Sequence, residues 1–167
     1  MTSTTSTNIF TQNFDLSISE DRAHELYGAW LSVVARSWRS EIDSKLADHG
    51  LTHSRWLALL VLSRFSAPVS QLSLAGAMGV SAATLVPTLD WLESRGMVVR
   101  RTSEVDRRRN EIALTSKSRV PIESIGLVLE EIRADIFRDV DTKDLLIALK
   151  VFFEINKSLT RLKGDTR

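Results

Sequence analysis

The chain contains no cysteine, which excludes a disulfide framework and thiolate metal sites. It also lacks a run of the about 20 apolar residues that a membrane helix needs, since the longest run spans only residues 56–62. No Lys or Arg precedes Arg22, so the first residues resemble neither a secretory signal nor a transit peptide. We therefore expect a cytoplasmic protein with a disordered polar tail over residues 1–18.

Motifs for catalysis are missing as well. The sequence has no Gly-x-Ser-x-Gly elbow, no phosphate loop and no dinucleotide fingerprint, so we predict neither an enzyme nor a cofactor. Zinc is the alternative raised by His24, His49 and His53. However, His49 and His53 straddle Gly50, and neither cysteine nor a His-Glu cluster accompanies them, so we predict no metal site.

Positive charge is concentrated in one segment of an almost neutral chain. The net charge is +1, yet residues 97–119 hold seven Lys or Arg against three acidic residues, a local excess of +4. Arg107, Arg108 and Arg109 are adjacent there, although neighbouring like charges repel. Such a segment is either a solvated charge run or an electrostatic footprint for phosphate, and its position in the fold decides between the two.

Apolar spacing predicts a mostly helical chain. Steps of three and four between apolar residues indicate a long amphipathic helix over residues 23–46, ended by His49-Gly50. A second helix, apolar nearly all round and so buried, is expected from a Thr52 cap to a stop at Ala67-Pro68. Two further helices are expected after residue 116, carrying Ile125 and Leu149 among their apolar positions.

The middle of the chain predicts a helix-turn-helix followed by a hairpin. Ser70 can cap a short helix that reaches Met78, and Ser81 can cap a second helix after a turn at Gly79. In the second helix Leu85, Leu89 and Leu92 share the inward face, with Ala83, Pro87, Asp90 and Ser94 opposite. Period-two stretches at 97–102 and 111–115 then predict two strands with a long charged tip.

A helix-turn-helix followed by an arginine-tipped hairpin resembles the winged helix of the multiple-antibiotic-resistance (MarR) family, in particular its SlyA branch. The resemblance covers about residues 20–162 and rests on residues 51–56, 85–101, 106–108 and 112–115. It implies a mainly α fold with a small β-hairpin, in which residues 51–115 form the DNA-binding domain. It further implies that residues 19–50 and 116–163 form an intertwined homodimerisation region.

The position of the arginines in a predicted wing indicates that they contact DNA. Guanidinium groups on a hairpin tip can enter the minor groove, where A·T-rich DNA has a narrow width and a deep negative potential. The resemblance assigns Arg108 to the minor groove and Arg107 to the backbone, with Asp106 bracing the hairpin through an ion pair. Arg109 completes the predicted DNA-binding set of the wing.

The predicted recognition helix carries no Lys or Arg between Ser81 and Ser94, so bidentate readout of guanine is excluded there. Pro87 also lacks the N–H that would bond the carbonyl of Ala83, at a cost of about 3 kcal/mol unless the helix starts late or kinks. We expect short major-groove contacts instead, from Ser81, Ala82 and Thr84, with most of the affinity supplied by the wing.

Relatives of this kind often release DNA when a small aromatic carboxylate or phenol binds. The residues that match such pockets are Arg36, Trp38, Arg39, Trp56 and Thr88. Arginine beside tryptophan suits an aromatic carboxylate as ligand. The guanidinium can donate two hydrogen bonds to the carboxylate, and the indole can stack on the aromatic ring. The alternative is that the tryptophans belong to the core and the arginines to surface or dimer ion pairs.

The sequence therefore predicts a dimeric DNA-binding transcriptional regulator, in particular a repressor or an anti-silencing factor. It is expected to bind a pseudo-palindromic operator, with double-stranded DNA, a second copy and an aromatic effector as partners. The alternative is a helical interaction module that has lost DNA binding or has no ligand response. Pro87 favours that alternative, and the retained arginines oppose it.

Overall fold

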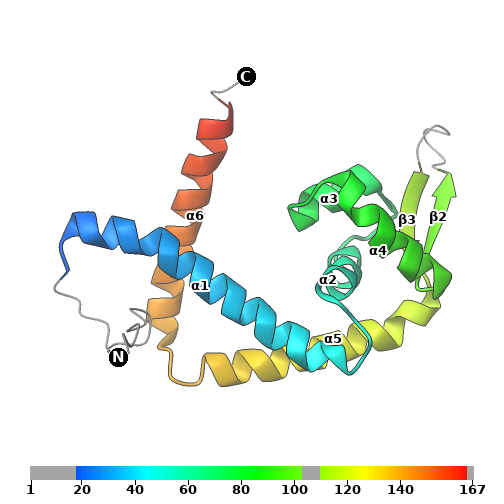
Figure 1. Cartoon of the computed structure of the whole chain (residues 1–167), viewed down its shortest axis with the longest axis horizontal. Helices are drawn as coiled ribbons and strands as arrows, with labels where there is room; N and C mark the ends of the chain where they lie inside the picture. The colour runs from blue at the N-terminus through cyan, green and yellow to red at the C-terminus, as the bar shows by residue number, and fades with distance from the viewer. Residues whose placement is uncertain (1–17, 103–109, 165–167) are drawn as a thin grey trace, which may run out of the picture.

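A computed structural model describes residues 18–102 and 110–164. Figure 1 shows a lobe built from α2, α3, α4 and the strands, with α1, α5 and α6 extending away from it. The elements in chain order are α1 (Glu20–Ala47), α2 (His53–Leu62), β1 (Val69–Ser70), α3 (Gln71–Met78), α4 (Ala82–Ser94), β2 (Val98–Thr102), β3 (Asn110–Leu114), η1 (Ser116–Ser118), α5 (Arg119–Ile136) and α6 (Thr142–Gly164). This mainly helical winged-helix architecture confirms the predicted fold class.

The core of the lobe is the leucine side of the helix-turn-helix. Leu85, Leu89 and Leu92 of α4 are buried as predicted, and they pack with Leu59 of α2 and Leu74 of α3. Gly79 joins α3 to α4 at φ +69, a left-handed conformation that residues with a Cβ rarely adopt. The turn thus fixes how the outer face of α4 is presented.

Helix α1 begins at Glu20, three residues earlier than its apolar spacing predicts. The Ser19 hydroxyl accepts a hydrogen bond from the Arg22 N–H at 3.3 Å and so caps the helix. Only Ile42 and Leu46 of α1 are buried, because only the C-terminal end of this helix packs on the lobe.

The expected start of α2 is confirmed and its expected end is wrong. Thr52 occupies the N-cap position, although its side chain makes no capping hydrogen bond. The helix ends at Leu62, well before Ala67-Pro68. The chain turns earlier because it enters a short strand, β1, that the sequence pattern does not indicate. Antiparallel pairing of Val69 with Ile112 places β1 beside β3, so the hairpin belongs to a three-stranded sheet of order β1-β3-β2.

Helix α6 is apolar but exposed. None of its described side chains is buried, although it carries a set of exposed large apolar residues that we call the α6 apolar set. A 6.2 Å ring contact between Tyr27 and Phe152 links α6 to α1. Neighbouring exposed apolar side chains on one helix are typical of an interaction surface, so this surface needs a cover. The α6 apolar set consists of Leu146, Ile147, Leu149, Phe152, Phe153 and Leu159.

Within residues 18–102 and 110–164, no single helix is both long and apolar enough to cross a membrane. Only α3 and α4 taken together, bent by 107° at the turn, reach that length and composition.

Candidate nucleic-acid interface

The first turn of α4 presents two hydroxyl groups to solvent. Ser81 Oγ accepts a hydrogen bond from the Thr84 N–H at 3.2 Å and lies 2.7 Å from Thr84 Oγ1. Both residues are exposed, and Ala82 between them is partly buried. The predicted major-groove residues therefore lie together at one helix end, where the free backbone N–H groups also favour an anion.

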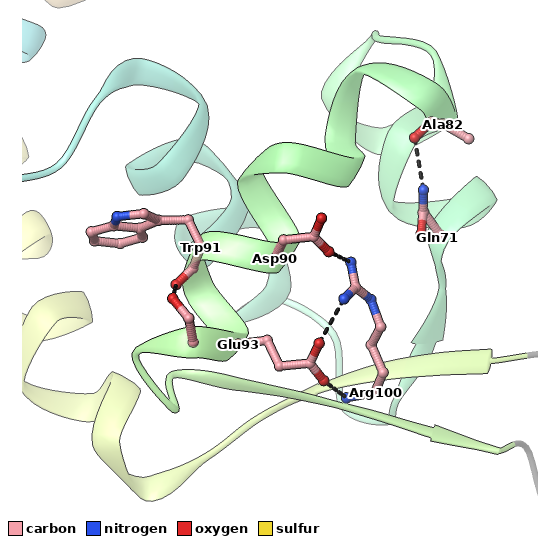
Figure 2. A network of polar contacts seen from close by, with 7 residues as sticks. Gln71, Ala82, Asp90, Trp91, Glu93 and Arg100 are labelled. Carbon is pink, nitrogen blue, oxygen red and sulfur yellow. Dashed lines mark hydrogen bonds and ion pairs between the residues drawn. The ribbon is translucent and has the colours of Figure 1, made fainter.

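Gln71 fixes this end of α4 to the preceding helix, a contact that the sequence analysis missed. Its side-chain amide donates a 2.7 Å hydrogen bond to the carbonyl of Ala82, as Figure 2 shows. Gln71 is the first residue of α3, so the bond spans the turn at Gly79. The sequence shows only that a glutamine stands at the start of α3. That position alone does not indicate a bond to Ala82, because the bond depends on how α3 and α4 pack.

Pro87 is accommodated without a late helix start. Helix α4 begins at Ala82 and continues through Pro87 to Ser94, so only the bond between position 87 and the carbonyl of Ala83 is lost. Ala83 and Pro87 are both exposed, as are Asp90 and Ser94. Water can therefore reach the carbonyl of Ala83 that has lost its usual donor, which reduces the cost of the proline.

Arg100 of β2 is bound to two carboxylates of α4. Its guanidinium donates 2.6 Å hydrogen bonds to Asp90 Oδ1 and to Glu93 Oε2, and its backbone N–H donates to Glu93 Oε1 at 3.1 Å (Figure 2). Burial lowers the pKa of Arg100, but these hydrogen bonds outweigh it and the pKa is raised above the ordinary guanidinium value. The local excess of +4 counted in the sequence thus included one arginine whose charge is compensated by α4.

The four predicted residues of the wing tip, Asp106 and Arg107 to Arg109, lie outside the described residues. The structure does describe the strand ends on either side, where Thr102 pairs with Asn110. The segment that carries the arginines therefore leaves from and returns to adjacent ends of one hairpin.

The structure distributes the five predicted effector residues over two regions, the lobe and helix α1. A cavity of about 600 Å³ between α1 and α5 is lined by Trp38 but by none of the other four. Trp56 and Thr88 are buried in the lobe, in agreement with the core alternative for Trp56. Arg36 and Arg39 are exposed, and Arg39 Nε donates to the carbonyl of Ala35 within its own helix.

The lining of the cavity combines aromatic rings with an excess of acidic groups. Trp30 and Trp38 contribute the rings, and the charged groups are Glu41, Asp135 and Lys45. Lys45 already binds Glu131 through a 2.6 Å contact, which raises the pKa of its ammonium group. A neutral ring is therefore better suited to this cavity than a carboxylate.

A carboxylate of α1 also holds the first turn of α2. Asp43 Oδ1 accepts a 2.7 Å hydrogen bond from the indole N–H of Trp56 and lies 3.2 Å from His53 Nδ1. Since Trp56 is a core residue, this contact joins the long helix directly to the lobe. Among residues 18–102 and 110–164 there is no group of three His, Asp or Glu that could hold a metal ion.

Comparisons with known proteins agree with this geometry. A model of the MarR family matches residues 51–109. The crystal structure of transcriptional regulator PA3341 is similar to this chain with a TM-score of 0.76 and 36% identity, over 81% of this chain and 98% of that one. The S. aureus MepR–DNA complex (TM-score 0.72, 18% identity, 79% and 97% covered) shares the fold. CouR from Rhodococcus jostii RHA1 bound to p-coumaroyl-CoA (0.70, 24%, 77% and 90%) shares it too.

Proposed function

Because the chain belongs to the MarR family of transcriptional regulators, we propose that it represses transcription by binding a pseudo-palindromic operator as a homodimer. Within the family, residues 85–101 and 106–108 favour the SlyA branch. The cytoplasm, where the operator DNA lies, is the proposed location. A MarR-family regulator is a binding protein and not an enzyme, so the chemistry of the site is recognition.

The observation that carries the proposal is the pairing of an exposed α4 N-terminus with a hairpin that bears three arginines. Ser81, Ala82 and Thr84 offer small polar and methyl groups that suit contact with base edges in the major groove. Arg107 to Arg109 supply the positive charge for phosphates and for the minor groove. MepR, which shares this fold, was crystallised with DNA.

Homodimerisation is supported by the α6 apolar set. A second copy related by a two-fold axis would cover the exposed side chains of α6 and pack against α1 and α5. Two lobes in one assembly would meet half-sites about 34 Å apart, one helical turn of DNA. The operator is therefore expected to be a pseudo-palindrome.

Selection of duplexes from a random library by the purified protein tests the proposal. We expect an enriched duplex with two-fold symmetry, bound about 1,000-fold or more tightly than a shuffled duplex of the same composition at physiological salt. Equal affinity for the two duplexes in a mobility-shift assay would contradict sequence-specific regulation and would favour an interaction module without DNA binding.

We also propose that the cavity between α1 and α5 binds a small phenolic effector that releases DNA. Trp30 and Trp38 suit stacking on a ring, whereas Glu41 and Asp135 disfavour a carboxylate. This modifies the expected ligand set, since Trp38 stays and the exposed Arg36 and Arg39 lie elsewhere. CouR, a protein of the same fold, was crystallised with an aromatic acyl thioester, p-coumaroyl-CoA.

Titration with 4-ethylphenol and with benzoate separates these ligand classes. The phenol is expected to quench tryptophan fluorescence and to weaken operator binding, because only a ligand that prefers one dimer conformation shifts the population. Benzoate is expected to do neither at the same concentration. Trp38→Phe should reduce the quenching, and an equal response to both compounds would contradict the role of the acidic lining residues.

A further inference from the structure

The ion-pair cluster of Asp90, Glu93 and Arg100 joins the two DNA-reading elements of the lobe. Asp90 and Glu93 belong to α4, and Arg100 belongs to the hairpin strand β2. Three hydrogen bonds connect them, two from the guanidinium and one from the backbone N–H of Arg100 (Figure 2). The backbone bond is important because it holds the strand itself and not only a flexible side chain.

The exposed fractions of these side chains indicate which groups are available to DNA. The Arg100 side chain is 24% exposed, whereas Asp90 is 58% and Glu93 is 38% exposed. Both terminal nitrogens of the guanidinium are already occupied by carboxylates. Arg100 is therefore poorly placed to bind a phosphate, although the sequence groups it with the cationic segment.

Charge alone gives no reason for two acids beside a DNA-binding hairpin. One arginine and two carboxylates leave the cluster with a net charge of −1, on a lobe whose proposed ligand is a polyanion. A cluster that weakens long-range attraction is retained most simply if its geometry serves another purpose. The geometry here fixes β2 against α4.

We propose that Arg100 is a positioning residue, which together with Asp90 and Glu93 sets the angle between the β2–β3 hairpin and the recognition helix α4. This inference rests on the proposed DNA-binding function and names a determinant within it. A fork of two terminal nitrogens can hold two carboxylates at once, which a lysine ammonium does less well. The cluster thereby orders the hairpin before DNA arrives, so less ordering is needed on binding.

Two variants separate positioning from direct charge contact. Arg100→Lys keeps the charge and loses the fork, so we expect operator affinity to fall about 10-fold, as for the loss of one or two charge-assisted hydrogen bonds. Asp90→Asn/Glu93→Gln makes the lobe more positive by two charges, yet we expect weaker binding as well. Arg101→Lys, at the exposed next position of β2, is the matched control and should bind like the wild type.

Amide hydrogen exchange of residues 98–102 without DNA supplies a second measurement, and the enriched duplex is the probe for affinity. Faster exchange together with weaker binding supports the proposal. Wild-type affinity of Arg100→Lys, or tighter binding of the double variant, overturns it. Weaker binding with unchanged exchange also overturns it, because Arg100 would then contact DNA directly. If the wild type enriches no duplex, the proposed function fails, while the exchange data still test whether the cluster orders β2.

Discussion

Phe153→Asp is expected to convert the protein into a monomer and to lower its operator affinity by about 100-fold or more. Phe153 is 66% exposed on α6 and belongs to the α6 apolar set. A two-fold interface would bury one unpaired carboxylate from each copy, so the desolvation cost opposes association twice. A monomer reaches only one half-site and loses the gain from linked binding.

Sedimentation velocity and mobility-shift titration measure the two effects. Lys150→Gln is the control, because it changes the charge of the same helix by the same −1 at an exposed position one turn from Glu154, on the polar side. The control should remain dimeric and bind normally. A dimeric Phe153→Asp variant would place the interface elsewhere, and a monomeric variant with full affinity would contradict the two-fold model of recognition.

Arg108→Ala is expected to weaken operator binding about 100-fold in the dimer. A charge-assisted contact contributes about 1.5 kcal/mol, and the dimer makes it twice. The slope of log affinity against log salt should also become shallower by about 2, because each neutralised phosphate contributes about 0.9. The loss should be larger for A·T-rich flanks, where the minor groove is narrow.

Arg138→Ala removes the same charge outside the winged helix. The Arg138 side chain is 71% exposed and binds Asp135, so this variant should leave both the affinity and the salt slope unchanged.

Thr84→Val tests how the recognition helix and the wing share the binding affinity. If Arg108→Ala bound normally while Thr84→Val abolished binding, the helix and not the wing would supply the affinity.

Local signals explain why the elements around the site could be predicted. Ser70 and Ser81 cap α3 and α4 through their hydroxyls, and Gly79 adopts the left-handed turn between them. The leucine spacing of α4 likewise determines which side is buried. Capping, turns and periodicity depend on residues a few positions apart, so they can be identified in the chain itself.

Contacts between distant segments could not be predicted in this way. The pairing of β1 with β3 joins residues some forty positions apart, and a two-residue strand has no period to detect. Arg100 belongs by sequence to a cationic segment, and only the packing of β2 on α4 brings it to Asp90 and Glu93. The charge of a segment in the sequence therefore overstates the charge that it presents to a ligand.

The effector residues show the same limit. Trp38 and Trp56 have equivalent signals in the sequence, yet Trp56 belongs to the core and Trp38 faces a cavity between two helices. The distinction depends on where α5 crosses α1, which neither helix encodes alone. Arg36 and Arg39 are exposed on the same helix as Trp38.

The bond between Asp43 and the Trp56 indole has a mechanical consequence. Ile42 and Leu46 also pack into the same core as Trp56. Side-chain contacts between α1 and α2 therefore span the turn at residues 48–52. We therefore expect the lobe and the C-terminal part of α1 to move as one rigid unit. In the proposed dimer, we therefore do not expect a change in the separation of the two lobes to come from bending at this turn.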